Sequence, residues 1–219
     1  MSAHRSATLT LGALICAVGL SACGSILPKA NPLEILQPQV SVAPDAAWPQ
    51  ADWQLAVSRP ATNDMLDSPR LAVSPTPGRI EVYQGVAWDD TVPGVVQQAT
   101  LAAFEDSGKL RAVGHQSSGT RADFILQLDL RDYQAVYRTP AGPPEIVLTI
   151  SARLIDFSRS RVVASRVFRQ TVPATAADVH AVAHAFDGAL ASVLHDLVGW
   201  TLDAGNQARA ADKAVDRKR

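Results

Sequence analysis

The alternation of hydrophobic and polar positions predicts strands over much of the middle of the chain. Apolar side chains recur at every second residue in several segments, which is the pattern of a strand that buries one face. Pro and Gly are frequent between these segments, as in the turn at 139–144. The predicted strands are residues 53–57, 70–73, 79–83, 110–113, 124–130, 146–154 and 161–171.

Two other segments repeat their apolar positions with the period of a helix. The first starts at the capping residues Asp90 and Thr91 and ends before Gly108. The second covers about 176–202. Its apolar stripe is formed by Val179, Ala183, Phe186, Leu190, Val193, Leu194 and Leu197. The predicted order is β-β-β-α-β-β-β-β-α, an α+β fold with a mostly antiparallel sheet and both helices packed on one face.

The beginning of the chain has the pattern of a secretory signal peptide. A weakly basic start precedes the apolar run 7–20, which is too short for a comfortable membrane span. Leu20-Ser21-Ala22-Cys23 follows and resembles a bacterial lipobox, in which the chain is cut before an acylated cysteine. We predict a signal peptide over 1–22 and lipidation of Cys23. The alternative is an ordinary signal peptide with an incidental cysteine.

Three further segments are expected after the cleavage site. Residues 23–52 hold the acylated Cys23 and a Pro-rich stretch, which predicts an extended tether. Residues 53–203 form a single domain, and the polar residues 204–219 predict a disordered tail. Some tether residues are apolar enough to dock on the domain or on a partner. They are Leu33, Ile35, Leu36 and Trp48.

Composition and charge exclude several classes of protein. The chain has 219 residues and a formal net charge of −1, which gives no electrostatic basis for binding nucleic acid. Two cysteines cannot form a disulfide framework in a chain of this length. The sequence contains neither a P-loop nor a Gly-x-Ser-x-Gly nucleophile motif. We therefore predict a protein that is not an enzyme and that carries no cofactor.

The last predicted helix carries histidines that are candidate metal ligands. His180, His184 and Asp187 share one face at a spacing that suits a divalent transition metal. The Glu of a His-Glu-x-x-His motif is missing, and no further His or Cys lies nearby in the sequence. Solvent-exposed histidines are the better interpretation, so no metal site is predicted.

Three residues are candidates for contact with a partner or a lipid. Arg153 and Arg166 belong to strands rich in arginine, and a basic sheet face suits anionic headgroups or an acidic partner. The alternative is that these charges keep an uncovered face soluble. Trp88 precedes the first helix and is either an exposed contact or part of the core beneath that helix.

Several short motifs, taken in order, resemble those of one family. They are Trp53-Gln54-Leu55, the segment 79–90 with Tyr83 and Trp88, the segment 104–114, Ala122-Asp123-Phe124 before Leu126 to Leu130, and a last helix containing Trp200. Together with the lipobox, they make the chain similar to the ABC-type transport auxiliary lipoproteins. Trp53 stands where a tyrosine is commoner in that family.

The resemblance implies a non-catalytic adaptor that is anchored by Cys23 to the outer membrane and faces the periplasm. The residues after Cys23 are consistent with sorting to the outer membrane. They are Gly24 and Ser25, and neither is the Asp that is associated with retention at the inner membrane. The implied partners are an Mce-domain protein and an ABC permease and ATPase that move lipids between membranes. A lipid-binding carrier and a structural envelope-assembly lipoprotein are the alternatives, and a homo-oligomer stays open.

Overall fold

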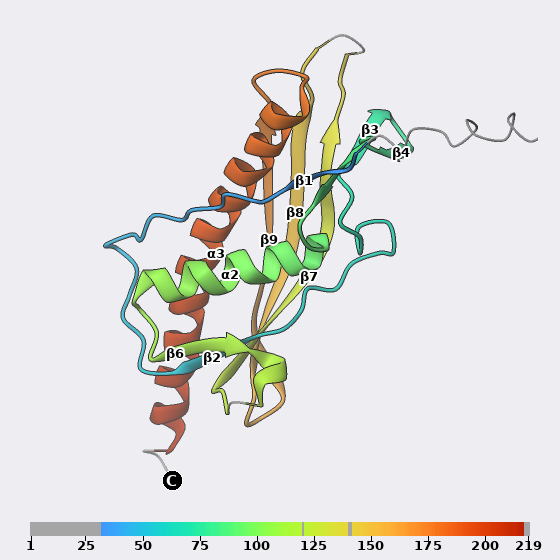
Figure 1. Ribbon diagram of the computed structural model, residues 1–219. Coiled ribbons are helices and arrows are strands. Elements are labelled where there is room, and N and C mark those ends of the chain that lie inside the picture. Colours follow the sequence, from blue (N-terminus) through green and yellow to red (C-terminus); the bar gives the residue numbers. More distant parts are fainter. Residues whose placement is uncertain (1–31, 120, 140–141, 217–219) are drawn as a thin grey trace, which may run out of the picture. The chain divides into compact units, whose positions relative to one another are not determined.

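The computed structural model describes residues 32–119, 121–139 and 142–216 (Figure 1). The signal peptide and Cys23 lie outside the described residues. The elements are β1 (Glu34–Leu36), β2 (Gln54–Val57), β3 (Ala72–Thr76), β4 (Arg79–Val82), β5 (Val86–Trp88), α2 (Val92–Ser107), β6 (Ala112–His115), the 3-10 helix η2 (Gln116–Ser118), β7 (Phe124–Val136), β8 (Glu145–Asp156), β9 (Arg161–Pro173) and α3 (Val179–Asp216).

The three longest strands form the centre of the fold. β7 pairs antiparallel with β8, with Leu126 opposite Leu154, and β8 pairs antiparallel with β9. The alternating side chains of β7 and β8 point into one hydrophobic core. A bulge at Arg131 shifts this alternation, so that Leu130 and then Tyr133 face the core.

The sheet is mixed, and the prediction of a mostly antiparallel sheet is wrong in this respect. β2 and β3 both pair parallel to β7, at opposite ends of the same edge, and β2 also pairs parallel to β6. Between them, Ala61 makes a parallel bridge to Asp129. Residues 55–62 and 73–74 therefore lie along this edge of β7, and the loop between them leaves it. Alternation reports which face of a strand is buried, but it does not report the direction of the neighbouring strand.

A second, two-stranded sheet was missed by the sequence analysis. β1 and β5 are three residues each and pair parallel, with Glu34 opposite Val86. Strands this short carry too few residues to show a period. The predicted order of elements is therefore incomplete.

Both predicted helices are present. α2 starts after Thr91 and ends at Gly108, whose φ of 60° is the left-handed conformation that favours glycine. The Thr91 side chain makes no capping hydrogen bond, in contrast to the prediction. α3 packs on β8 and β9, and α2 packs on α3, β2 and β6 (Figure 1). The two helices thus enclose the core with the sheet.

Residues 33–52, which we call the strap, lie on the domain rather than forming a free tether. Trp48 is 7% exposed and its ring lies 5.0 Å from that of His195 in α3. His180 lies 3.4 Å from Glu34 and His195 lies 3.7 Å from Asp45. The tether prediction for this part is corrected: Val42 and Trp48 are buried in the core cluster, whereas Leu33 and Ile35 stay exposed. Prolines do not prevent an extended chain from packing.

The expected disordered tail is also corrected. α3 continues from its predicted end at 202 to Asp216. Asp212 holds the helix to the β8–β9 turn through an ion pair with Arg159. Gln207 and Lys213 are exposed, whereas Ala204 and Ala208 pack against the core.

Candidate functional site

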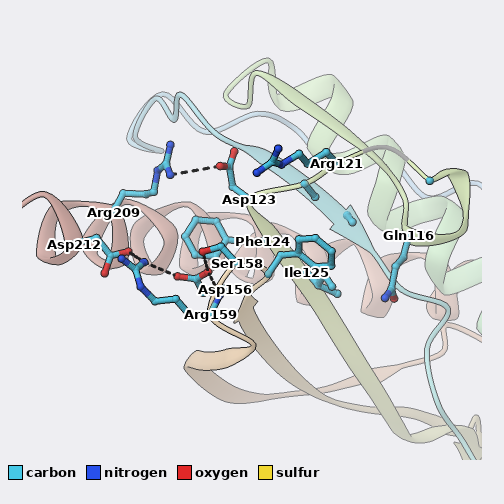
Figure 2. A pocket seen from close by; sticks show the side chains of 14 residues that line it. Gln116, Arg121, Asp123, Phe124, Ile125, Asp156, Ser158, Arg159, Arg209 and Asp212 are labelled. Atoms are coloured by element: carbon cyan, nitrogen blue, oxygen red, sulfur yellow. Dashed lines mark hydrogen bonds and ion pairs between the residues drawn. The ribbon is translucent and has the colours of Figure 1, made fainter. Parts of the chain in front are cut away.

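The largest of the cavities described lies where β7 begins, β8 ends and the last turns of α3 pass by (Figure 2). It has a volume of about 800 Å³. Its walls combine apolar side chains with arginines and aspartates from four separate segments. The charged residues lining it are Arg121, Asp123, Asp156, Arg159, Arg209 and Asp212.

One wall of the cavity is an ion-pair network around Arg159. Arg159 Nη1 lies 3.0 Å from Asp156 Oδ2 and also contacts Asp212. Ser158 Oγ donates a hydrogen bond of 2.7 Å to Asp156 Oδ1, and the Arg159 N–H donates a second. Burial alone would raise the pKa of Asp156, but the hydrogen bonds from Ser158 and Arg159 outweigh it and lower this pKa. Asp156 is therefore a fully engaged carboxylate.

Asp123 organises the opposite wall. Its Oδ2 accepts a hydrogen bond of 2.9 Å from the backbone N–H of Gln54, and its Oδ1 lies 3.4 Å from Arg209 Nη1. Figure 2 shows the Arg121 guanidinium directed toward Asp123 from the side opposite Arg209. Within the described ranges, Arg121 has no ion pair or hydrogen bond, and the buried Nε of Arg209 has no hydrogen-bond partner.

Apolar side chains line the remainder of the cavity. Phe124 is buried and packs edge-on against Trp53, with 5.1 Å between the ring centroids, whereas Ile125 is half-buried. Phe157 in the β8–β9 turn is 53% exposed. A phenyl ring so exposed, beside guanidinium groups, makes this cavity amphipathic.

The candidate contact Trp88 lies in the core and not at the surface. It is 2% exposed, and its ring meets that of Phe186 edge-on at 5.7 Å. Phe186 in turn stacks on Tyr133 at 4.7 Å. Burial of this aromatic cluster stabilises the junction of β5, β7 and α3, so the structure assigns Trp88 to packing.

The two candidate arginines lie on opposite faces of the sheet. Arg166 pairs with Ala152, on the core face, and its guanidinium lies 5.0 Å above the ring of Phe168. Arg153 pairs with Ser165 and lies on the face away from the helices, where it lines a smaller cavity with Arg59. They therefore do not form one basic patch.

The face shared by His180, His184 and Asp187 carries the strap. His180 lies against Glu34, and Asp187 is 9% exposed. Burial raises the pKa of Asp187, and the backbone N–H of Gln39 and the neighbouring His184 partly offset that effect. Among the residues described, no cluster of three or more His, Cys, Asp or Glu has the geometry of a metal site.

Sequence reasoning missed the cavity. Arg121, Phe157 and Arg209 come from a loop, a turn and a helix end, and no local pattern links them. Asp123-Phe124 was noticed as part of a motif before a strand, and that was the one signal near the cavity. Over the described residues, none of the helices has the length and apolar character that crossing a membrane requires.

The chain belongs to the family described as the ABC-type transport auxiliary lipoprotein component, whose model matches residues 34–198. The match begins in the strap and ends within α3. The family so described is one of transport auxiliary lipoproteins.

Known proteins support this membership. The crystal structure of protein XCC0632 from Xanthomonas campestris, of the DUF330 family, has 40% sequence identity and a TM-score of 0.77, covering 80% of this chain and 98% of that one. A second solved structure, of an uncharacterized protein, has 11% identity and a TM-score of 0.60, with 76% and 97% coverage, and shows the fold alone. The uncharacterized protein bll6063 of Bradyrhizobium diazoefficiens is 28% identical over 148 residues, which are 68% of this chain and 39% of that relative's length.

Proposed function

We propose that this chain is a lipid-anchored, non-catalytic adaptor of an ABC/Mce-type lipid transport system, held at the outer membrane and facing the periplasm. The observation that carries the proposal is the family match over residues 34–198. The sequence Leu20-Ser21-Ala22-Cys23 adds the anchoring chemistry, because a thiol at this position is the acyl acceptor of a lipobox. The proposed partners are an Mce-domain protein and an ABC permease with its ATPase.

The strap changes how the proposed anchor positions the domain. Because residues 33–52 lie on the domain, residues 23–33 set the largest distance between the proposed anchor and the domain. An extended chain spans at most about 3.6 Å per residue, so this distance is about 35 Å. Several acyl chains on Cys23 would give lasting membrane attachment. The adaptor would thus work close to its membrane, and partners must reach it there.

The uncovered sheet face is the surface that we propose for a partner. Arg153 and Arg169 are exposed on β8 and β9 and have no ion pair or hydrogen bond within the described part of the chain. On the same face, Thr149 lies opposite Arg169, and both Thr149 and Ser151 are buried. A face with free guanidinium groups favours an acidic protein surface, and the association should weaken with salt.

The anchoring step has a matched pair of cysteine variants. Cys23→Ala should abolish incorporation of labelled palmitate and release the protein from the membrane fraction. Cys16→Ala changes the other cysteine, which lies within the apolar run of the predicted signal peptide, and should leave both unchanged. Incorporation that persists in Cys23→Ala would refute the anchor.

The adaptor role is tested by affinity purification of the tagged, full-length protein after mild crosslinking in cells. We expect an Mce-domain subunit and the permease to co-purify with it. Arg153→Gln should reduce their recovery, whereas Arg70→Gln, which changes an exposed arginine outside this face, should not. Reproducible absence of transport subunits, with a defective envelope and unchanged lipid flux in a deletion strain, would favour the structural alternative instead.

A further inference from the structure

We infer that the cavity at the end of β7 binds a small anionic amphiphile, a carboxylate or phosphate group on an apolar body, with Arg121 and Arg209 holding the anion. This inference goes beyond the proposed adaptor role. It assigns a ligand class to a site that the family description does not mention. The argument combines the unpartnered donors, the exposed apolar wall and the place of the cavity in the fold.

Two guanidinium groups of the cavity carry donors without a partner. Arg121 lacks a partner among the described residues, and so does the buried Nε of Arg209. The carboxylates of the cavity, in contrast, already have partners. They are bound by Gln54, Arg209, Ser158, Arg159 and Arg161. Buried polar groups in proteins are nearly always hydrogen-bonded. A ligand that completes this site must therefore bring acceptor oxygens, as an anion does.

The apolar wall requires more than an inorganic anion. Phe157 leaves about half of its surface in water at the cavity, beside Ile125 and Phe124. Covering this surface gains about 25 cal/mol for each Å² of apolar area removed from water. An uncharged lipid would cover the ring but leave the arginines without acceptors. A molecule with both parts satisfies both walls.

The cavity lies far from the start of the strap. Glu34 of the strap contacts His180 near the start of α3, whereas Asp212 of the cavity lies near its end. At 1.5 Å per residue, these helix positions are separated by about 48 Å. The described chain therefore begins beside the end of α3 that is remote from the cavity, and the path to the anchor proposed at Cys23 starts there. We accordingly take the ligand to be a dispersed molecule and not a headgroup of the anchoring bilayer.

Binding is tested by calorimetry on the full mature lipoprotein in phosphatidylcholine nanodiscs, with empty nanodiscs as the blank. The probes are dihexanoyl phosphatidate and octanoate, which carry an anion on an apolar body, together with dihexanoylglycerol, which lacks the anion, and glycerol 3-phosphate, which lacks the apolar body. We expect saturable binding of at least one of the first two. The last two should bind at least about tenfold more weakly.

Variants on each wall locate the bound probe. Arg121→Gln should weaken binding by at least about tenfold, Arg121→Lys should restore part of it, and Arg70→Gln should have no effect. Phe157→Ser should weaken binding of the amphiphile, with the exposed Ile80→Ser as the matched control. These side chains are at the surface, so the variants are expected to fold, which circular dichroism verifies.

Several outcomes would overturn the inference. Equal binding of phosphatidate and dihexanoylglycerol would show that the arginines play no part. Glycerol 3-phosphate binding as tightly as phosphatidate would reduce the cavity to an anion site. Unchanged affinity in Arg121→Gln, or binding of an acidic peptide without any binding of the amphiphiles, would also refute it. None of these outcomes depends on co-purification of transport subunits, so the adaptor proposal fails or stands separately.

Discussion

The indole nitrogen of Trp53 donates a hydrogen bond of 2.8 Å to Oδ1 of Asn206, joining the start of β2 to the C-terminal half of α3. Trp53 is completely buried, and Asn206 also donates through Nδ2 to the backbone oxygen of Gln50, at 3.0 Å. Gly205 lies directly under the indole: a Cβ there would be 2.3 Å from Cζ2 of Trp53. This contact explains why α3 stays ordered past residue 202.

Gly205→Ala is therefore expected to lower the free energy of unfolding. In an exposed helix interior, replacing Gly by Ala stabilises by about 1 kcal/mol. Here the added methyl group collides with a buried ring, and overpacking of this kind costs about 1–3 kcal/mol. Gly188→Ala is the matched control in the same helix, because nothing lies within 4 Å of its Cβ position. Urea denaturation should show opposite signs for the two variants, and equal signs would contradict the contact.

The strap should detach when its buried tryptophan is removed. Trp48→Ala deletes the side chain that packs on α3 beside His195 and Gly199. Removing a buried aromatic ring costs about 3 kcal/mol, and the loss should fall mainly on the strap. Hydrogen exchange of residues 34–50 should accelerate strongly, with little change in β7 and β8. Leu33→Ala removes a strap side chain that is 59% exposed and should leave exchange unchanged.

The network around Asp156 should give the fold an acid-sensitive component. Its folded-state pKa is lowered, so its stabilisation is present above the ordinary pKa of about 3.9 and is lost as the pH falls through the folded value. Asp156→Asn should cost about 1 kcal/mol at pH 7, since it weakens charge-assisted hydrogen bonds to Arg159 and Ser158. The difference from the wild type should shrink below about pH 4. A difference that stays constant down to pH 3 would argue against an ionised Asp156 in this role.

Asp187 should behave in the opposite sense. Its Oδ1 is buried without a hydrogen-bond partner in the described structure, and the pKa of its carboxyl is raised. Stability from the neutral form is complete below about pH 3.9 and is lost as the pH rises through the raised folded pKa. Asp187→Asn should therefore stabilise the fold by about 1 kcal/mol at pH 7, and this gain should vanish below about pH 4. The exposed Asp203 in the same helix provides the control variant Asp203→Asn.

Local pattern was sufficient for the elements whose burial repeats along the chain. The alternation from Phe124 to Leu130 and the apolar stripe from Phe186 to Leu197 mark a strand and a helix, because burial of one face imposes a period on the sequence. Gly108 marked the end of α2 for a related reason, since its left-handed backbone disfavours a side chain. The bulge at Arg131 shows the limit of predicting burial from local pattern. It shifts the alternation by one residue, and no residue type in the sequence marks its place.

The sequence by itself determined where the long strands and the two helices begin, the segment that resembles a lipobox and the family motifs, since each of these depends on residues that are neighbours in the chain. The tertiary structure decided the parallel pairing of β2 and β3 with β7, the docking of the strap on α3, and the cavity that unites Arg121, Phe157 and Arg209. The physical reason is that burial leaves a period within a segment. Which distant segments pair depends on the packing of the whole core, so this pairing cannot be predicted from the sequence of any one segment.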